Sequence, residues 1–173
     1  MGREVRKVPK DWQHPKAITK RLHGYEMGFI PLHGRSFAVD AAEWDQECAR
    51  WNAGDYPDYA SEEDKSMSYA EWAGERPKQE DYMPDWPESE RTHFMMYEDT
   101  SEGTPISPAF ETPEELARWL ADNGASAFGS STASYEQWLY VARGGWAPSL
   151  VYSPQTGLIS GVEASETIER GEA

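Results

Sequence analysis

The sequence predicts an α+β fold, with a small antiparallel sheet, about three short helices and a long acidic loop region. Three segments open with a helix-capping pattern and continue with apolar residues at helical spacing. The strand-like segments do not alternate regularly with these helices, so a parallel βαβ sheet is not expected. Residues 55–91 are rich in Asp, Glu, Pro and Tyr without a sustained period, which is typical of a long loop, with one turn of helix expected near Ser68 to Trp72.

Residues 1–40 are predicted to form a basic, extended N-terminal arm with short strands. Residues 1–23 hold seven Lys/Arg against two Asp/Glu, a net charge of +5, and two prolines interrupt regular structure there. A strand is expected near Arg3 to Val8. Short apolar pieces broken by Gly and Pro follow in residues 24–39 and indicate loops or short strands.

The rest of the chain is strongly acidic. The whole chain has a formal net charge of −15, so residues 24–173 carry −20. After the arm we therefore expect an acidic α+β domain over residues 41–165 and an acidic tail over residues 166–173.

The first predicted helix runs from Ala41 to Ala53. Asp40 is its expected N-cap, and Glu43 stands three residues later as a capping-box partner. One face of this helix holds the residues spaced i, i+4 and i+7: Trp44, Cys48 and Trp51. Cys48 is therefore interpreted as an inert core thiol. As the single cysteine, it excludes an intrachain disulfide and a Cys-based zinc cluster.

Two further helices are predicted to begin after Thr112 and Ser134. Thr112 is followed by Pro113 at the first helical position and by Glu115 as the capping-box partner. Ser134 is followed by Gln137 in the same role. Both helices continue with Leu and Trp at helical spacing and end at glycine.

Strands are predicted on both sides of these helices. Residues 92–97 form one strand, and Ile106 to Phe110 returns antiparallel to it after a turn. A C-terminal hairpin is expected from residues 149–153 and 158–162, which flank the turn sequence Pro-Gln-Thr-Gly. The acidic residues after it are predicted to be a frayed tail or a short helix.

The sequence carries no catalytic signature. It has neither a G-x-S-x-G elbow nor a G-x-x-x-x-G-K phosphate loop. His14, His23 and His33 lack the close spacing of metal ligands, and His93 is interpreted as a core histidine in a strand. Neighbouring carboxylates follow no pattern that separates acid–base catalysis from a solvated acidic surface. We therefore expect a protein that is not an enzyme and that uses no cofactor and no metal.

The candidate partner-binding residues come from two stretches in which acidic and aromatic residues alternate. Tyr and Trp are preferred anchors of protein interfaces, and carboxylates around them attract Lys and Arg. The alternative is that the aromatics pin a long loop to the core, and both roles are compatible. The candidates are Asp55, Tyr56, Asp58, Tyr59, Glu62, Glu63, Asp64, Trp72, Asp81, Tyr82, Asp85 and Trp86.

The net charge limits the classes of partner. A strongly negative body disfavours direct binding of nucleic acid or of an anionic membrane. It favours basic partners, including the nucleic-acid-binding surfaces of other proteins, although the charge can also simply maintain solubility.

No apolar stretch follows the basic N-terminus, so no signal peptide is expected, and no run is suited to span a membrane. The single cysteine fits a reducing compartment.

Several blocks resemble a family of small acidic accessory proteins of tailed phages and prophages. These blocks are REVRKVPKDWQHPK near the N-terminus, YMPDW at Tyr82 to Trp86, and MYEDTSEGTPISPAFETPEELARWLADNGASAFG with STASYEQWL inside Thr92 to Leu139. The resemblance implies a phage or prophage origin and an action in the cytoplasm of a bacterial host. It assigns no catalytic residue.

Together these observations lead to one main hypothesis and two alternatives. The main hypothesis is an accessory protein that binds a host protein, such as an anti-CRISPR or anti-restriction inhibitor that occupies a basic nucleic-acid-binding surface. The first alternative is a structural or morphogenesis component that self-associates. The second is an enzyme with an unrecognised site.

Overall fold

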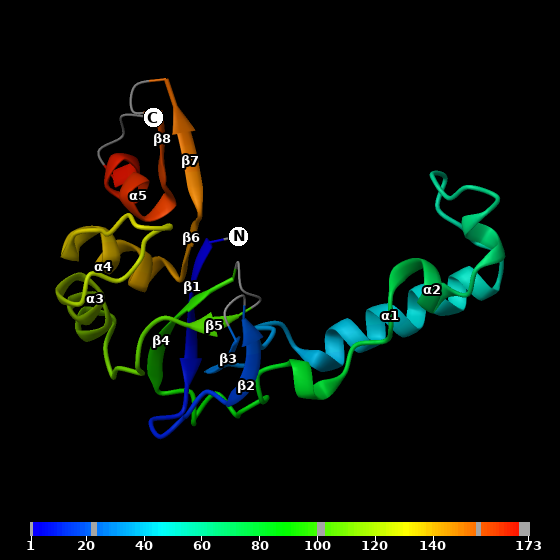
Figure 1. Ribbon diagram of the computed structural model, residues 1–173, viewed down its shortest axis with the longest axis horizontal. Coiled ribbons are helices and arrows are strands. Elements are labelled where there is room, and N and C mark those ends of the chain that lie inside the picture. The colour runs from blue at the N-terminus through cyan, green and yellow to red at the C-terminus, as the bar shows by residue number, and fades with distance from the viewer. Residues whose placement is uncertain (1, 22–23, 100–102, 155–156, 170–173) are drawn as a thin grey trace. The chain divides into compact units, whose positions relative to one another are not determined.

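The chain divides into two compact units in the computed structural model (Figure 1). The model describes residues 2–21, 24–99, 103–154 and 157–169. Unit 1 comprises Met1–Pro31 and Trp86–Ala173, and unit 2 comprises Leu32–Asp85. This division differs from the predicted succession of arm, domain and tail, because contacts that no local pattern reveals join the N-terminal strands to the second half of the chain.

Unit 1 is built on an antiparallel sheet of four strands in the order β5-β4-β1-β6. The strands are β1 (Gly2–Val8), β4 (His93–Glu98), β5 (Thr104–Pro105) and β6 (Trp146–Pro148). β1 pairs with β4 along its length, with Val5 opposite Met96, and with β6 on its other side. The strand expected near Arg3 to Val8 is therefore confirmed as β1, which is an inner strand of the sheet.

The mixed α+β class is confirmed, and so is the strand predicted at residues 92–97, which is β4. β4 begins one residue later than predicted. The predicted return strand at Ile106 to Phe110 is wrong in position: the strand that pairs with β4 is Thr104–Pro105, and within the predicted range only Phe110 forms an isolated bridge, to Phe94.

Three helices cover the sheet and enclose the core of unit 1 (Figure 1). They are α3 (Pro113–Asp122), α4 (Tyr135–Gly144) and α5 (Gly161–Glu169). The predicted capping boxes at Thr112 and Ser134 are both present, so these two helix starts are confirmed. The fully buried side chains of the core include Met96, Leu116, Leu120, Trp138, Val141 and Val162.

Two antiparallel hairpins belong to unit 1. The first joins β2 (Lys16–Arg21) to β3 (Gly24–Phe29), and the second joins β7 (Leu150–Ser153) to β8 (Gly157–Ser160). The second is the predicted C-terminal hairpin, although its turn residues 155–156 lie outside the described residues. The predicted tail begins as part of α5, which packs against α4, and residues 170–173 also lie outside the described residues.

A hydrogen-bonded network fixes the loop between β1 and β2. His14 is 6 % exposed, and its Nε2 lies 2.6 Å from the carbonyl oxygen of Ile30. Its Nδ1 lies 3.2 Å from the hydroxyl of Tyr97, which also accepts a hydrogen bond from Trp12 Nε1. When Nε2–H donates to Ile30, Nδ1 can accept from the Tyr97 hydroxyl, so a neutral imidazole satisfies this network.

Unit 2 contains α1 (Phe37–Asn52), η1 (Asp64–Ser66), α2 (Tyr69–Ala73) and η2 (Gln79–Asp81). The predicted first helix is confirmed, but it begins four residues earlier, after Ser36 instead of Asp40. The predicted loop of residues 55–91 contains three short helical segments, and the one at Tyr69–Ala73 coincides with the single turn expected there. None of the helices in the described ranges combines the length and apolar composition that a membrane span requires.

Candidate partner-binding surface

The aromatic residues of the first acidic stretch surround Trp51 of α1. Trp51 is 4 % exposed, and the indole of Trp72 stacks on it with centroids 4.5 Å apart. Tyr56 meets Trp51 edge-on at 4.8 Å, and Tyr69 lies 5.9 Å away. Tyr59 stacks on the outer side of Trp72 at 6.2 Å and remains 81 % exposed. Tyr56 and Trp72 therefore have the pinning role, whereas Tyr59 keeps a free surface.

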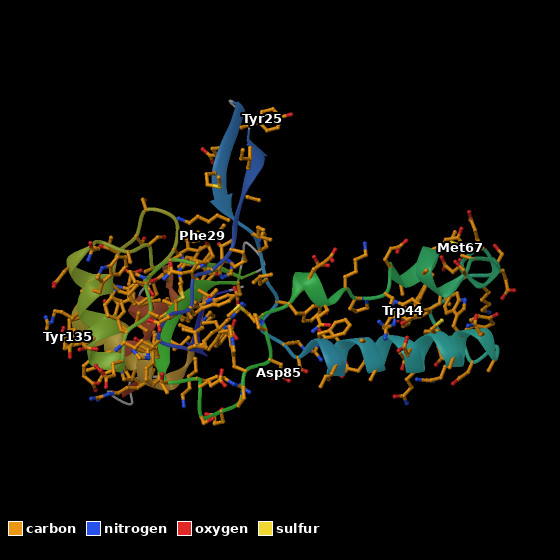
Figure 2. The ribbon with its side chains drawn as sticks, turned by 90° about the horizontal axis from the view of Figure 1, so that it is seen from below. Tyr25, Phe29, Trp44, Met67, Asp85 and Tyr135 are labelled. Carbon is orange, nitrogen blue, oxygen red and sulfur yellow. The ribbon has the colours of Figure 1, made fainter. Side chains whose placement is uncertain are left out.

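Hydrogen bonds hold residues 67–74 against α1. Trp51 Nε1 donates to the carbonyl of Met67 at 3.0 Å, and Trp44 Nε1 donates to the carbonyl of Gly74 at 3.1 Å. Ser68 and Glu71 form a reciprocal capping box at the start of α2. Trp44 lies between α1 and the segment that runs back along it through α2, and Met67 lies at the end of the unit opposite Asp85 (Figure 2). We call residues 67–74 the returning segment. The returning segment is thus ordered by contacts with α1.

The carboxylates of unit 2 lie on its outside. The unit contains fourteen Asp/Glu and five Lys/Arg, a net charge of −9. Four of the five basic residues are engaged in exposed ion pairs with neighbouring carboxylates. These pairs are Arg35 with Asp40 and Glu43, Arg50 with Glu47 and Asp55, Lys65 with Glu62, and Arg76 with Asp45. Basic charge inside the unit is therefore already largely compensated.

Several exposed carboxylates of unit 2 take no part in these pairs. We call Asp58, Glu63, Glu75 and Glu80 the free acidic set. Asp58 and Glu63 flank the exposed Tyr59 in sequence. Negative charge at these positions is available to a partner.

Hydrogen bonds keep several other carboxylates ionised. Ser61 donates to Asp64 from its hydroxyl at 2.6 Å and from its backbone N–H at 2.8 Å, which lowers the pKa of Asp64. Arg76 donates twice to Asp45 at 2.8 Å and lowers the pKa of that carboxyl. Ser68 lowers the pKa of Glu71 in the same way. Since each shift favours the charged form, the surface of unit 2 stays negative into the acidic range.

The second acidic stretch lies at the other end of α1. The Tyr82 hydroxyl donates to Asp40 at 3.0 Å, and the Tyr82 ring meets Phe37 at 5.6 Å. Burial, and then the bond to Asp40, raises the pKa of Tyr82. Phe37 and Trp51 are fourteen residues apart, about 20 Å along a helix. The two acidic stretches therefore do not form one site.

The predicted site residues separate into three locations. Asp55 to Asp64 and Trp72 lie with the C-terminal half of α1, and Asp81, Tyr82 and Asp85 belong to the segment that begins at η2. Trp86 belongs to unit 1, where its ring meets Trp12 edge-on at 4.7 Å. The first location holds most of the predicted residues and is the candidate partner-binding surface.

Sequence reasoning missed two exposed apolar pairs in unit 1. Ile18 of β2 and Met27 of β3 are cross-strand neighbours, 68 % and 62 % exposed. Tyr152 of β7 and Leu158 of β8 are also cross-strand neighbours, 71 % and 64 % exposed. Period-2 alternation identifies which residues share a face of a strand, but it does not say whether that face is covered.

No group of three His, Cys, Asp or Glu side chains converges to hold a metal ion in the part of the chain that the structure describes. An open hollow of about 530 Å³ on unit 1 is lined by aromatic, acidic and amide side chains and by Arg118, with no histidine or cysteine. In it the Arg118 guanidinium lies 3.8 Å over the Tyr135 ring.

Comparison with known proteins does not extend this description. No family model, no curated protein and no solved structure matches the chain.

Proposed function

We propose that the protein acts by binding a partner protein through the acidic surface of unit 2, and that the partner surface is basic and normally binds nucleic acid. The observation that carries this proposal is the charge of unit 2. Unit 2 carries a net charge of −9 in 54 residues, and four of its five basic side chains already form ion pairs within the unit. A partner rich in Lys and Arg is the chemical complement of such a surface.

The aromatic cluster supports the proposal by making the surface rigid. The rings around Trp51 pack against each other, so the carboxylates are carried on an ordered scaffold and lose little entropy on binding. Tyr59 is the aromatic best placed to touch a partner, because it is exposed and lies beside Asp58. Binding is thus led by carboxylates, with one aromatic anchor.

The resemblance to phage accessory proteins narrows the proposal to an anti-defence inhibitor. A host restriction or CRISPR effector presents a basic groove that holds DNA or RNA. An acidic protein seated in that groove excludes the nucleic acid by charge and by volume. The finer identity of the partner rests on this resemblance.

The test compares two variants with the same change in charge. The unit 2 variant neutralises the free acidic set with Asp58→Asn, Glu63→Gln, Glu75→Gln and Glu80→Gln. The control variant neutralises four exposed carboxylates of unit 1 with Glu90→Gln, Glu111→Gln, Asp122→Asn and Glu136→Gln. Wild type and both variants are used to capture proteins from bacterial lysate, which are identified by mass spectrometry.

We expect the wild type and the control variant to capture the same nucleic-acid-handling protein, and the unit 2 variant to capture much less. Added duplex DNA should compete, and binding should weaken as salt rises toward about 1 M, where the Debye length is about 3 Å. Equal capture by both variants would place the site outside the free acidic set. Capture that resists both DNA and salt contradicts the nucleic-acid-mimic mechanism.

A further inference from the structure

The C-terminal hairpin of unit 1 presents an uncovered apolar face. Tyr152 and Leu158 lie opposite each other in the β7–β8 ladder, and Leu150, two residues before Tyr152, shares their face and is 38 % exposed. Val151 and Ile159 alternate with them and are half-buried, and α5 packs against both strands. One face of the hairpin is therefore covered by α5, and the other meets solvent.

This face also lacks charge. Residues 144–162 contain no Asp, Glu, Lys, Arg or His, although the chain as a whole carries −15. A contiguous uncharged apolar face on so acidic a protein is typical of an interaction surface. We propose that a second copy of this chain covers it, with the two β7–β8 hairpins stacked face to face about a two-fold axis.

Symmetry argues for a second copy as the occupant. In a two-fold contact the same patch meets itself, so any charged residue near the axis faces its own like charge. An uncharged patch avoids that repulsion between two chains of −15. The exposed Ile18–Met27 pair does not meet this condition, because the charged and exposed Lys16 and Glu26 share its hairpin.

The small size of the face predicts a weak dimer. Three apolar side chains from each copy fall well short of the roughly 1,200–2,000 Å² that stable interfaces bury. We therefore expect a dissociation constant between about 1 μM and 1 mM. Salt should strengthen the dimer by screening the repulsion between the acidic surfaces, which is opposite to its effect on the proposed binding of a basic partner.

Sedimentation velocity of the full chain across this concentration range tests the proposal. Wild type should pass from monomer to dimer, at lower concentration in higher salt. Tyr152→Ser with Leu158→Ser should remove the dimer or raise its dissociation constant at least about tenfold. Ile18→Ser with Met27→Ser is the matched control, because it removes a cross-strand pair of nearly equal exposure, and it should dimerise like wild type.

Three results would overturn the proposal: a monomer throughout the range, a hairpin variant that dimerises like wild type, or a control variant that loses the dimer. Circular dichroism of both variants checks that they remain folded, which we expect because all four side chains are exposed. The hairpin variant leaves the free acidic set unchanged. Absence of a dimer would therefore not affect the proposal tested by capture from bacterial lysate, and failure of that capture would not affect the proposed dimer.

Discussion

The indole of Trp72 stacks on the indole of Trp51 with centroids 4.5 Å apart and 25° between the ring planes. Trp51 belongs to α1 and Trp72 to α2, so this stack joins the two α-helices of unit 2. Around it the other rings and the two indole hydrogen bonds form the interior of the unit. The acidic surface therefore depends on a small aromatic core.

Trp51→Ala should unfold unit 2. Removing a buried Trp costs about 3–5 kcal/mol, which is comparable with the whole stability expected for a unit of this size, roughly 0.05–0.15 kcal/mol per residue. Hydrogen exchange followed by mass spectrometry should show loss of protection in residues 37–73. Tyr59→Ala is the control and should leave exchange unchanged, because Tyr59 is 81 % exposed. Full protection in Trp51→Ala would mean that other contacts hold the unit.

His14 should make stability depend on pH. Burial lowers the pKa of His14 below its ordinary value of 6.5. The neutral form is therefore favoured in the folded state, and its contribution is complete above pH 6.5 and is lost as the pH falls through the lowered pKa. Urea unfolding should show a fall in stability below pH 6.5, before the carboxylates titrate. His14→Gln should flatten this fall, whereas His93→Gln should not.

Tyr97 should resist ionisation. Burial raises the pKa of Tyr97 to about 12, because its ring is enclosed and its charged form would be poorly solvated. Ultraviolet titration of the folded protein should show one tyrosine that ionises near this value, and Tyr97→Phe should remove that step. The same substitution leaves Trp12 Nε1 and His14 Nδ1 without their partner and should cost about 1–3 kcal/mol. An unchanged titration curve would contradict the buried position of the ring.

Arg3→Met should destabilise unit 1. Arg3 is 1 % exposed, and its guanidinium donates to the carbonyl of Ser126 at 2.8 Å and to Glu98 at 3.2 Å. Hydrogen bonds to charged groups contribute about 1.5–3 kcal/mol, so we expect a loss of that size in urea unfolding. Lys7→Met on the same strand is the control, because the exposed pair of Lys7 with Glu88 contributes about 0–1 kcal/mol. Equal effects of the two substitutions would contradict a special role for Arg3.

Local signals account for the elements that were predicted well. The capping boxes at Thr112 and Ser134 each lie within four residues, so a short stretch of sequence specifies both helix starts. The start of α1 was placed too late, because Asp40 resembles an N-cap but its carboxylate instead accepts from Tyr82, 42 residues away. A contact at that distance in sequence leaves no local signal.

The same limit applies to the candidate site. Acidic and aromatic alternation located the segments that matter, but it could not distinguish a ring buried on Trp51 from a ring offered to a partner. Trp72 and Tyr59 have similar neighbours in sequence, but Trp72 is half-buried and Tyr59 is exposed. Likewise, β1 pairs with residues about ninety positions away, so its place inside the sheet could not be read from its own composition.

The inner position of β1 has a consequence for synthesis on the ribosome. Its partners, β4 and β6, end at Glu98 and Pro148, so the sheet cannot be completed until most of the chain has been translated. In the sequence, the helices of unit 2 come after β1 and before both of its partners. The contacts within unit 2 are local in sequence. Because local contacts form fastest, we expect unit 2 to fold while β1 is still unpaired. Nascent chains halted when unit 2 has left the ribosome and β4 is still inside the exit tunnel should then already protect Trp51, with the N-terminal strand open to protease.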